Sequence, residues 1–214
     1  MALLSVVSMS VAFLLPSAAP PQQLPVAFAG GHTRAACVRC CATEVEIPVP
    51  ELKSEVSFDF VPLLTALQAG EFREADFLTR AALITIAGEA AVKRGYVYYT
   101  EAPKLPMQDM ATLERLWRAY SDGKFGYAVQ RKAFESKKVG GNFDKFFARI
   151  GWMHKGGSLL RWLPEAKGDE FIYDLEKAPK GHLPLTSTLR GQQLLKGLLE
   201  HPAWDTEEFA DVTF

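Results

Sequence analysis

The chain has 214 residues, of which 48% are hydrophobic, and its formal net charge is −1 at pH 7. This nearly neutral balance lacks the basic excess expected of a nucleic-acid-binding protein. The first 43 residues contain no Asp or Glu and include Arg34 and Arg39, which is typical of an organelle-targeting presequence. Within them, residues 2–15 are almost continuously apolar but fall short of the roughly 20 residues that a membrane span needs.

We therefore interpret residues 1–43 as a plastid-targeting presequence in two parts, one signal-like and one transit-like. A simple transit peptide with an apolar start is the alternative. All three cysteines, Cys37, Cys40 and Cys41, lie in this leader, so no cysteine chemistry is expected in the mature protein. Residues 44–57 are polar and contain prolines, and we interpret them as a linker.

The residues from Phe58 onward suit one domain of ordinary size with its own core. Apolar residues recur at helical spacing from Phe60 to Leu67, before Gly70, and again from Ala75 to Ile86. These two segments are predicted to pack as a helical hairpin. In the second of them, Asp76 and Glu74 are expected to be solvated or capping acids.

Three further apolar stripes predict helices. The first lies around residues 113–120, with Asp109 as its expected N-cap, the second runs from Phe143 to Ile150 behind Asn142, and the third covers residues 194–199. Only residues 171–175 alternate like a strand, and one short strand cannot form a sheet. The predicted fold class is therefore all-α, a compact single domain of short helices.

Two connections are unusually long and apolar for a helical domain, residues 96–108 and residues 152–175. Such loops either cover the core or contact a ligand. The aromatic run at 116–130, which surrounds a glycine-containing turn, suits either a core corner or the wall of a site for a flat apolar ligand.

Catalytic and metal-binding patterns are missing from the sequence. His154, His182 and His201 lie far apart, no glycine pair follows a phosphate-binding pattern, and no serine sits in a G-x-S-x-G motif. We therefore predict neither a catalytic residue nor a metal site, and we do not expect His182 to be an axial ligand.

Six motifs in order resemble the genomes-uncoupled-four family: EADFLT (74–79), LWRAYSDGKFGYAVQ (116–130), IGW (150–152), APKGHLPL (178–185), LRG (189–191) and HPAW (201–204). The resemblance implies a non-catalytic tetrapyrrole-binding domain over residues 58–204, with a cupped surface for protoporphyrin IX or magnesium protoporphyrin IX. It also implies a chloroplast protein that stimulates magnesium chelatase through the large H subunit of that enzyme. Peripheral association with a plastid membrane is compatible with such a pigment carrier.

The resemblance further assigns the ligand contacts to the two loops and to the start of the last helix. Arg190 is the expected clamp for the porphyrin propionates, because a guanidinium pairs bidentately with a carboxylate, whereas Trp117 is expected in the core. Residues 205–214 form an acidic tail that either contacts the chelatase or is solvated. Rival hypotheses are a tetrapyrrole-modifying enzyme and a protein-interaction module without pigment. The eight implied contacts are Ala102, Leu105, Met110, Leu113, Phe171, Ile172, Ser187 and Arg190.

Overall fold

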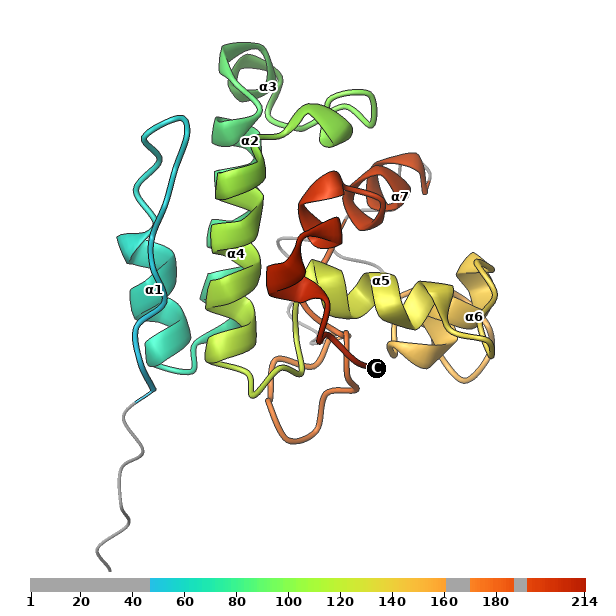
Figure 1. The fold of residues 1–214 in the computed structure, drawn as a ribbon. Coiled ribbons are helices and arrows are strands. Elements are labelled where there is room, and N and C mark those ends of the chain that lie inside the picture. Colours follow the sequence, from blue (N-terminus) through green and yellow to red (C-terminus); the bar gives the residue numbers. More distant parts are fainter. Residues whose placement is uncertain (1–46, 161–169, 187–191) are drawn as a thin grey trace, which may run out of the picture. The chain divides into compact units, whose positions relative to one another are not determined.

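The computed structural model describes residues 47–160, 170–186 and 192–214. The chain divides into two units, Met1–Glu44 and Val45–Phe214, and every described residue belongs to the second. The described part contains helices and one isolated bridge between Met153 and Leu159, without a strand, so the predicted all-α class is confirmed. Its helices (Figure 1) are α1 (Val61–Gln68), α2 (Phe72–Ile86), α3 (Glu89–Arg94), η1 (Ala102–Lys104), α4 (Met107–Ala119), α5 (Tyr127–Glu135), α6 (Phe143–Arg149), α7 (Gln193–Leu199), η2 (Pro202–Asp205) and η3 (Glu207–Phe209), where η denotes a 3-10 helix.

The predicted hairpin of α1 and α2 is confirmed, because the two helices pack against each other and α1 also contacts α4. Gly70 makes the turn between them with a φ of +72°, which glycine adopts without steric cost. Phe60 and Leu63 on one side and Ala75 on the other are buried in the shared core. The apolar spacing of the sequence is therefore the spacing of the buried faces.

The predicted N-cap of α4 is wrong. The helix begins at Met107 after Pro106, and Asp109 is fully buried within its first turn. Its carboxylate accepts hydrogen bonds from the Ser54 hydroxyl and, at 2.8 Å, from the Glu55 N–H. Asp109 thus binds a segment that lies 54 and 55 residues earlier in the chain.

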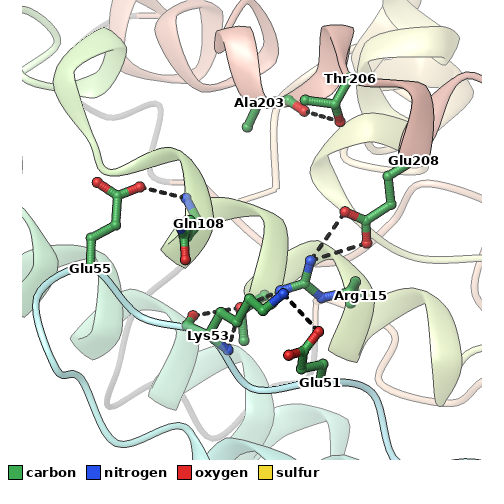
Figure 2. A network of polar contacts seen from close by, with 9 residues as sticks. Glu51, Lys53, Glu55, Gln108, Arg115, Ala203, Thr206 and Glu208 are labelled. Atoms are coloured by element: carbon green, nitrogen blue, oxygen red, sulfur yellow. Dashed lines mark hydrogen bonds and ion pairs between the residues drawn. The ribbon is translucent and has the colours of Figure 1, made fainter.

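The residues that were expected to form a linker lie along α4 and are bound to it in the same way. Thr112 accepts a hydrogen bond from the Lys53 N–H at 3.2 Å and donates one to the Lys53 carbonyl at 2.6 Å. The Glu55 carboxylate accepts the N–H of Gln108 at 2.9 Å, at the start of α4. Figure 2 shows Lys53 and Glu55 reaching α4 from this segment. Residues 53–55 are therefore bound to the domain by five different donor and acceptor groups of their own.

The C-terminal residues 202–214 fold back onto α4 and α5. Phe209 and Val212 are buried, and Trp204 stacks on Tyr127. Three acids of this segment pair with three arginines: Glu208 with Arg115 (Figure 2), Asp211 with Arg118, and Asp205 with Arg131. A fully solvated tail, one of the two alternatives from the sequence, does not describe these packed residues.

Residues 170–186 form an irregular segment with turns at 175–177 and 180–181, without the strand predicted at 171–175. Two backbone hydrogen bonds join the segment to the turn before α5, Gly181 N–H to the Lys124 carbonyl and Gly126 N–H to the Leu183 carbonyl, and side chains add further contacts. Gln130 of α5 donates to the carbonyls of Gly181 and Pro184 at 3.0 and 2.8 Å, and Trp152 donates from its ring nitrogen to the His182 carbonyl at 2.8 Å. Residues 181–184, which follow the second apolar loop, are thus fixed by Gln130 of α5 and by Trp152.

Candidate functional site

An ion pair between two partly buried side chains holds the loop between α3 and α4. Arg94 contacts both carboxylate oxygens of Glu101 at 2.8 and 2.6 Å, and the Tyr98 N–H donates to the same carboxylate at 2.8 Å. The Tyr98 N–H and, to a lesser degree, the Arg94 guanidinium lower the pKa of Glu101. The guanidinium also lies 4.2 Å from the centroid of the Tyr98 ring. This arrangement leaves Tyr98 and Tyr99 44% and 55% exposed.

The base of this loop is covered by α7. Both Ala102 and Leu105 are buried, and the Leu105 carbonyl accepts a hydrogen bond from His201 Nε2 at 3.0 Å. A Cβ on Gly197 would stand 3.0 Å from the Ala102 Cβ and 3.4 Å from the Tyr99 carbonyl oxygen. The close approach of α7 to η1 therefore depends on the missing side chain of Gly197.

Two more predicted contacts, Met110 and Leu113, lie on the inward face of α4 and are fully buried. Together with Ala102 and Leu105 they belong to the main hydrophobic core. All four residues therefore lie in the interior of the domain. Their direct contact with a ligand stays a prediction.

Phe171 and Ile172 belong to the second loop. The Phe171 ring packs edge-on against Trp152 and lies 6.0 Å from the His182 ring, while Ile172 is 37% exposed. The Ile172 N–H donates to His182 Nε2 at 3.0 Å, and His182 Nδ1 lies 2.7 Å from the Ile150 carbonyl. Both ring nitrogens of His182 are therefore occupied, and burial lowers its pKa, so the ring is neutral and offers no nitrogen to a metal.

The remaining predicted contacts, Ser187 and Arg190, lie outside the described residues. The segment that leads to them is described as far as Thr186. Its Leu185 N–H donates to the Asp76 carboxylate at 2.7 Å, and Arg80 contacts the other carboxylate oxygen at 2.7 Å. Asp76 is fully buried, which corrects the expectation of a solvated or capping acid.

Burial raises the pKa of Asp76 to about 6, against the lowering effects of Arg80 and of the Leu185 N–H. Asp76 therefore keeps its proton to an unusually high pH although it has two good partners. Its signal in the sequence is weak, because an acid one turn before an arginine in a helix reads as an ordinary surface pair.

Glu114 is a second buried acid that the sequence analysis missed. Burial raises its pKa to about 7, while the N–H groups of Ala128, Tyr127 and Val129 at the start of α5 lower it. Neither carboxylate oxygen makes a hydrogen bond of full geometry, so Glu114 faces the amino end of α5 without a strong partner. By contrast, Trp117 lies in the core as predicted, and its ring N–H donates to Thr79 at 2.9 Å.

Across residues 47–160, 170–186 and 192–214, no three His, Cys, Asp or Glu side chains gather in a group that could hold a metal ion. The helices of the same residues are all too short or too polar to cross a membrane. The exposed side chains of the two loops are mixed: the apolar side chains of Tyr98, Tyr99 and Ile172 lie among exposed charged ones such as Lys104 and Glu170. Apolar surface with a few polar groups is the composition expected of a site for a flat apolar ligand that carries charges at its edge.

Comparisons with known proteins agree with the motifs. The chain is 46% identical over 139 residues to the "Tetrapyrrole-binding protein, chloroplastic" of Arabidopsis thaliana. The aligned part covers 64% of this chain and 52% of the relative. It is 40% identical over 153 residues to the "Ycf53-like protein" of Synechocystis sp., covering 72% of this chain and 62% of the relative. The matched part thus spans about half to three fifths of these curated relatives.

Solved structures are similar over nearly their whole length. GUN4 from Chlamydomonas reinhardtii matches with a TM-score of 0.63 and 42% identity, over 72% of this chain and 95% of that chain. Ligand-free GUN4 from Arabidopsis thaliana matches with a TM-score of 0.62 and 44% identity, over 70% and 100%. A family described as GUN4-like matches residues 53–202. The chain therefore belongs to the GUN4-like family.

Proposed function

We propose that this protein is a non-catalytic tetrapyrrole-binding protein. The observation that carries the proposal is the family match over residues 53–202, which contains both apolar loops and all eight predicted contacts. The relative from Arabidopsis thaliana in this family is named for tetrapyrrole binding. The exposed rings of Tyr98 and Tyr99 on a fixed loop, and the exposed side chain of Ile172 on the other, support it physically.

The ligand in this proposal is protoporphyrin IX or magnesium protoporphyrin IX. Either one is a rigid apolar disc with two propionates on one edge, so it needs an apolar surface and a cation at the rim. Burial of a few hundred Å² of such a disc at ~25 cal/mol/Å² contributes several kcal/mol before the cost of immobilisation. The loops provide the surface, and Arg190 provides the cation.

We propose that the protein delivers the bound porphyrin to magnesium chelatase. The partner in this step is the large H subunit of the enzyme, and the process is chlorophyll biosynthesis. The place is the chloroplast, which agrees with the name of the relative from Arabidopsis thaliana, and peripheral contact with a plastid membrane belongs to the same proposal. Addition of the protein to purified chelatase is expected to raise the rate of magnesium insertion. An unchanged rate would remove this role and leave porphyrin binding in place.

Porphyrin binding is tested by quenching of tryptophan fluorescence in the full-length chain, with deuteroporphyrin and its magnesium derivative as ligands. Saturable quenching is expected in the native protein, with weaker binding in Arg190→Ala and unchanged binding in Lys138→Ala, which removes an exposed cation of the α5–α6 connection. Equal weakening in both variants would indicate a general charge effect. No saturable quenching in the native protein would favour an interaction module without pigment.

A further inference from the structure

The two predicted ligand contacts on the second loop depend on a neighbouring backbone segment that is not helical. Residues 178–186, here called the stem segment, end directly before Ser187. Within the stem segment, His182 accepts the N–H of Ile172 at 3.0 Å, so its position also sets that of Ile172. The contacts that fix the stem segment therefore also fix Ile172, one of the predicted ligand contacts. They also fix the point from which the chain continues toward Arg190.

Two helices and the turn between α4 and α5 supply side chains to the stem segment or to the residues before it. Gln130 of α5 donates to the carbonyls of Gly181 and Pro184, and Lys124 of the turn donates to the Leu175 carbonyl. Asp76 of α2 contributes a charge-bearing acceptor, which takes the Leu185 N–H at 2.7 Å. A hydrogen bond to an ionised carboxylate is stronger than one between neutral groups.

We propose that Asp76 is a positioning residue for porphyrin binding: its carboxylate fixes the backbone at Leu185 and thereby the stem segment, to which Ile172 is bound through His182, without touching the ligand. The inference rests on the proposed function. It gives a role to a fully buried acid that has one backbone amide and one arginine as its partners.

The ionisation of Asp76 affects its contacts with the charged and polar groups around it. Arg80 pairs with it from the same helix. The phenols of Tyr127 on α5 and Tyr173 in the second loop lie near it: burial raises the pKa of both phenols, and the charge of Asp76 raises it further. Glu114 of α4 also acts on Tyr127. Burial raises the pKa of Asp76, and the charge of Arg80 lowers it. Protonation of Asp76 removes the charge from its hydrogen bond with the Leu185 N–H.

Three variants separate positioning from mere stability. Asp76→Asn keeps the volume and an acceptor oxygen but removes the charge, and Asp76→Ala removes both. Thr79→Val, one turn further along α2, is the matched control, because Thr79 is also fully buried and accepts the Trp117 ring N–H, yet has no bond to the stem segment. Deuteroporphyrin binding is measured for each full-length chain by fluorescence quenching, beside urea unfolding.

At pH 8 the expected Kd rises roughly tenfold for Asp76→Ala, which corresponds to the loss of one good polar contact, and less for Asp76→Asn. Thr79→Val is expected to lose stability but to keep the native Kd. Between pH 8 and about pH 5.5 the Kd of the native protein is expected to rise roughly threefold more than that of Asp76→Asn, because only the native residue takes up a proton. Titration of the porphyrin propionates cancels in this comparison.

Native affinity in Asp76→Ala, or the same pH profile in Asp76→Asn as in the native protein, would overturn the positioning role. If Asp76→Ala does not fold, the pH profile of Asp76→Asn decides. Failure of the proposed function looks different, because the native protein itself would then show no saturable binding at pH 8.

Discussion

The carboxylate of Glu114 occupies the space that a side chain on Gly126 would need. A Cβ at Gly126 would stand 2.3 Å from Glu114 Oε1 and 2.7 Å from its Cδ, well inside van der Waals contact. Gly126 also has a φ of +140°, which side-chain-bearing residues rarely adopt. This contact joins α4 to the start of α5 and explains the glycine in the aromatic run 116–130.

We expect Gly126→Ala to be among the most destabilising single changes in the chain. Strain of the backbone and the clash with Glu114 together cost about 3 kcal/mol or more. Gly88→Ala is the matched control, because Gly88 also has a positive φ of +98° with an extended ψ of 177° but no atom within 4 Å of the added Cβ, so only the backbone cost of about 1–3 kcal/mol applies. Urea unfolding compares the two, and equal losses would show that the Glu114 contact is unimportant.

The stability of the protein is expected to depend on the ionisation of Glu114. Its pKa is about 7 in the folded protein against a usual value of 4.5, so the folded protein keeps a proton that the unfolded chain has released. The free energy of unfolding is therefore highest below pH 4.5 as far as this group is concerned, and it falls as the pH rises toward 7.

Glu114→Gln removes this dependence. Relative to the native protein, the variant is expected to gain up to roughly 3 kcal/mol in free energy of unfolding between pH 4.5 and pH 8. Urea unfolding of both proteins at the two pH values measures the change, and all other titrating groups cancel in the difference. A difference that stays constant with pH would mean that Glu114 ionises normally in the fold.

The C-terminal residues are expected to hold by apolar burial more than by ion pairs. Phe209 is almost completely buried, and Phe209→Ala should cost about 3 kcal/mol. Asp211 has a side chain that is 74% exposed, and it lies 3.4 Å from Arg118, so Asp211→Asn should cost less than about 1 kcal/mol. Thermal or urea unfolding distinguishes the two, and the reverse order would mean that the arginines hold the tail.

Gly197→Ala tests the packing of α7 on the first loop. Alanine inside a helix normally gains about 0.5–1 kcal/mol over glycine, but here the new Cβ meets the Ala102 Cβ at 3.0 Å. The variant is expected to lose rather than gain stability and to bind deuteroporphyrin more weakly, because Tyr99 moves with the loop. Lys196→Ala on the exposed side of the same helix serves as the control. An increase in stability with native porphyrin affinity would contradict the tight packing of α7 on η1.

Local signals in the sequence predicted the parts of this fold that local contacts determine. Asn142 is the N-cap of α6 as expected, and its side chain accepts the Lys145 N–H at 3.0 Å. The ends of α2 and α7 also lie near their predicted positions, because glycine and proline end these helices. The short helices α3 and α5 were not predicted. In α5, four buried residues in the first turn leave no simple apolar stripe at helical spacing.

Contacts between distant residues could not be read from the sequence. Asp109 looked like an N-cap, but its partners are Ser54 and Glu55, which no spacing rule connects with it. The same holds for Asp76 and Leu185, which are 109 residues apart. The candidate site shares this property, because its loops are placed by such long-range polar contacts, and their composition alone indicates only that they are apolar.

The bond between Ser54 and Asp109 has a consequence for shortening of the chain from its N-terminus. Removal of the residues up to Glu55 would leave the buried Asp109 carboxylate without the Ser54 and Glu55 donors, and an unsatisfied buried acceptor costs about 1–3 kcal/mol or more. The same truncation would remove the Ser54 hydroxyl that accepts the Phe58 N–H at 2.8 Å. Residues 53–55 therefore belong to the stable unit, and a shortened chain needs them to keep the stability of the domain.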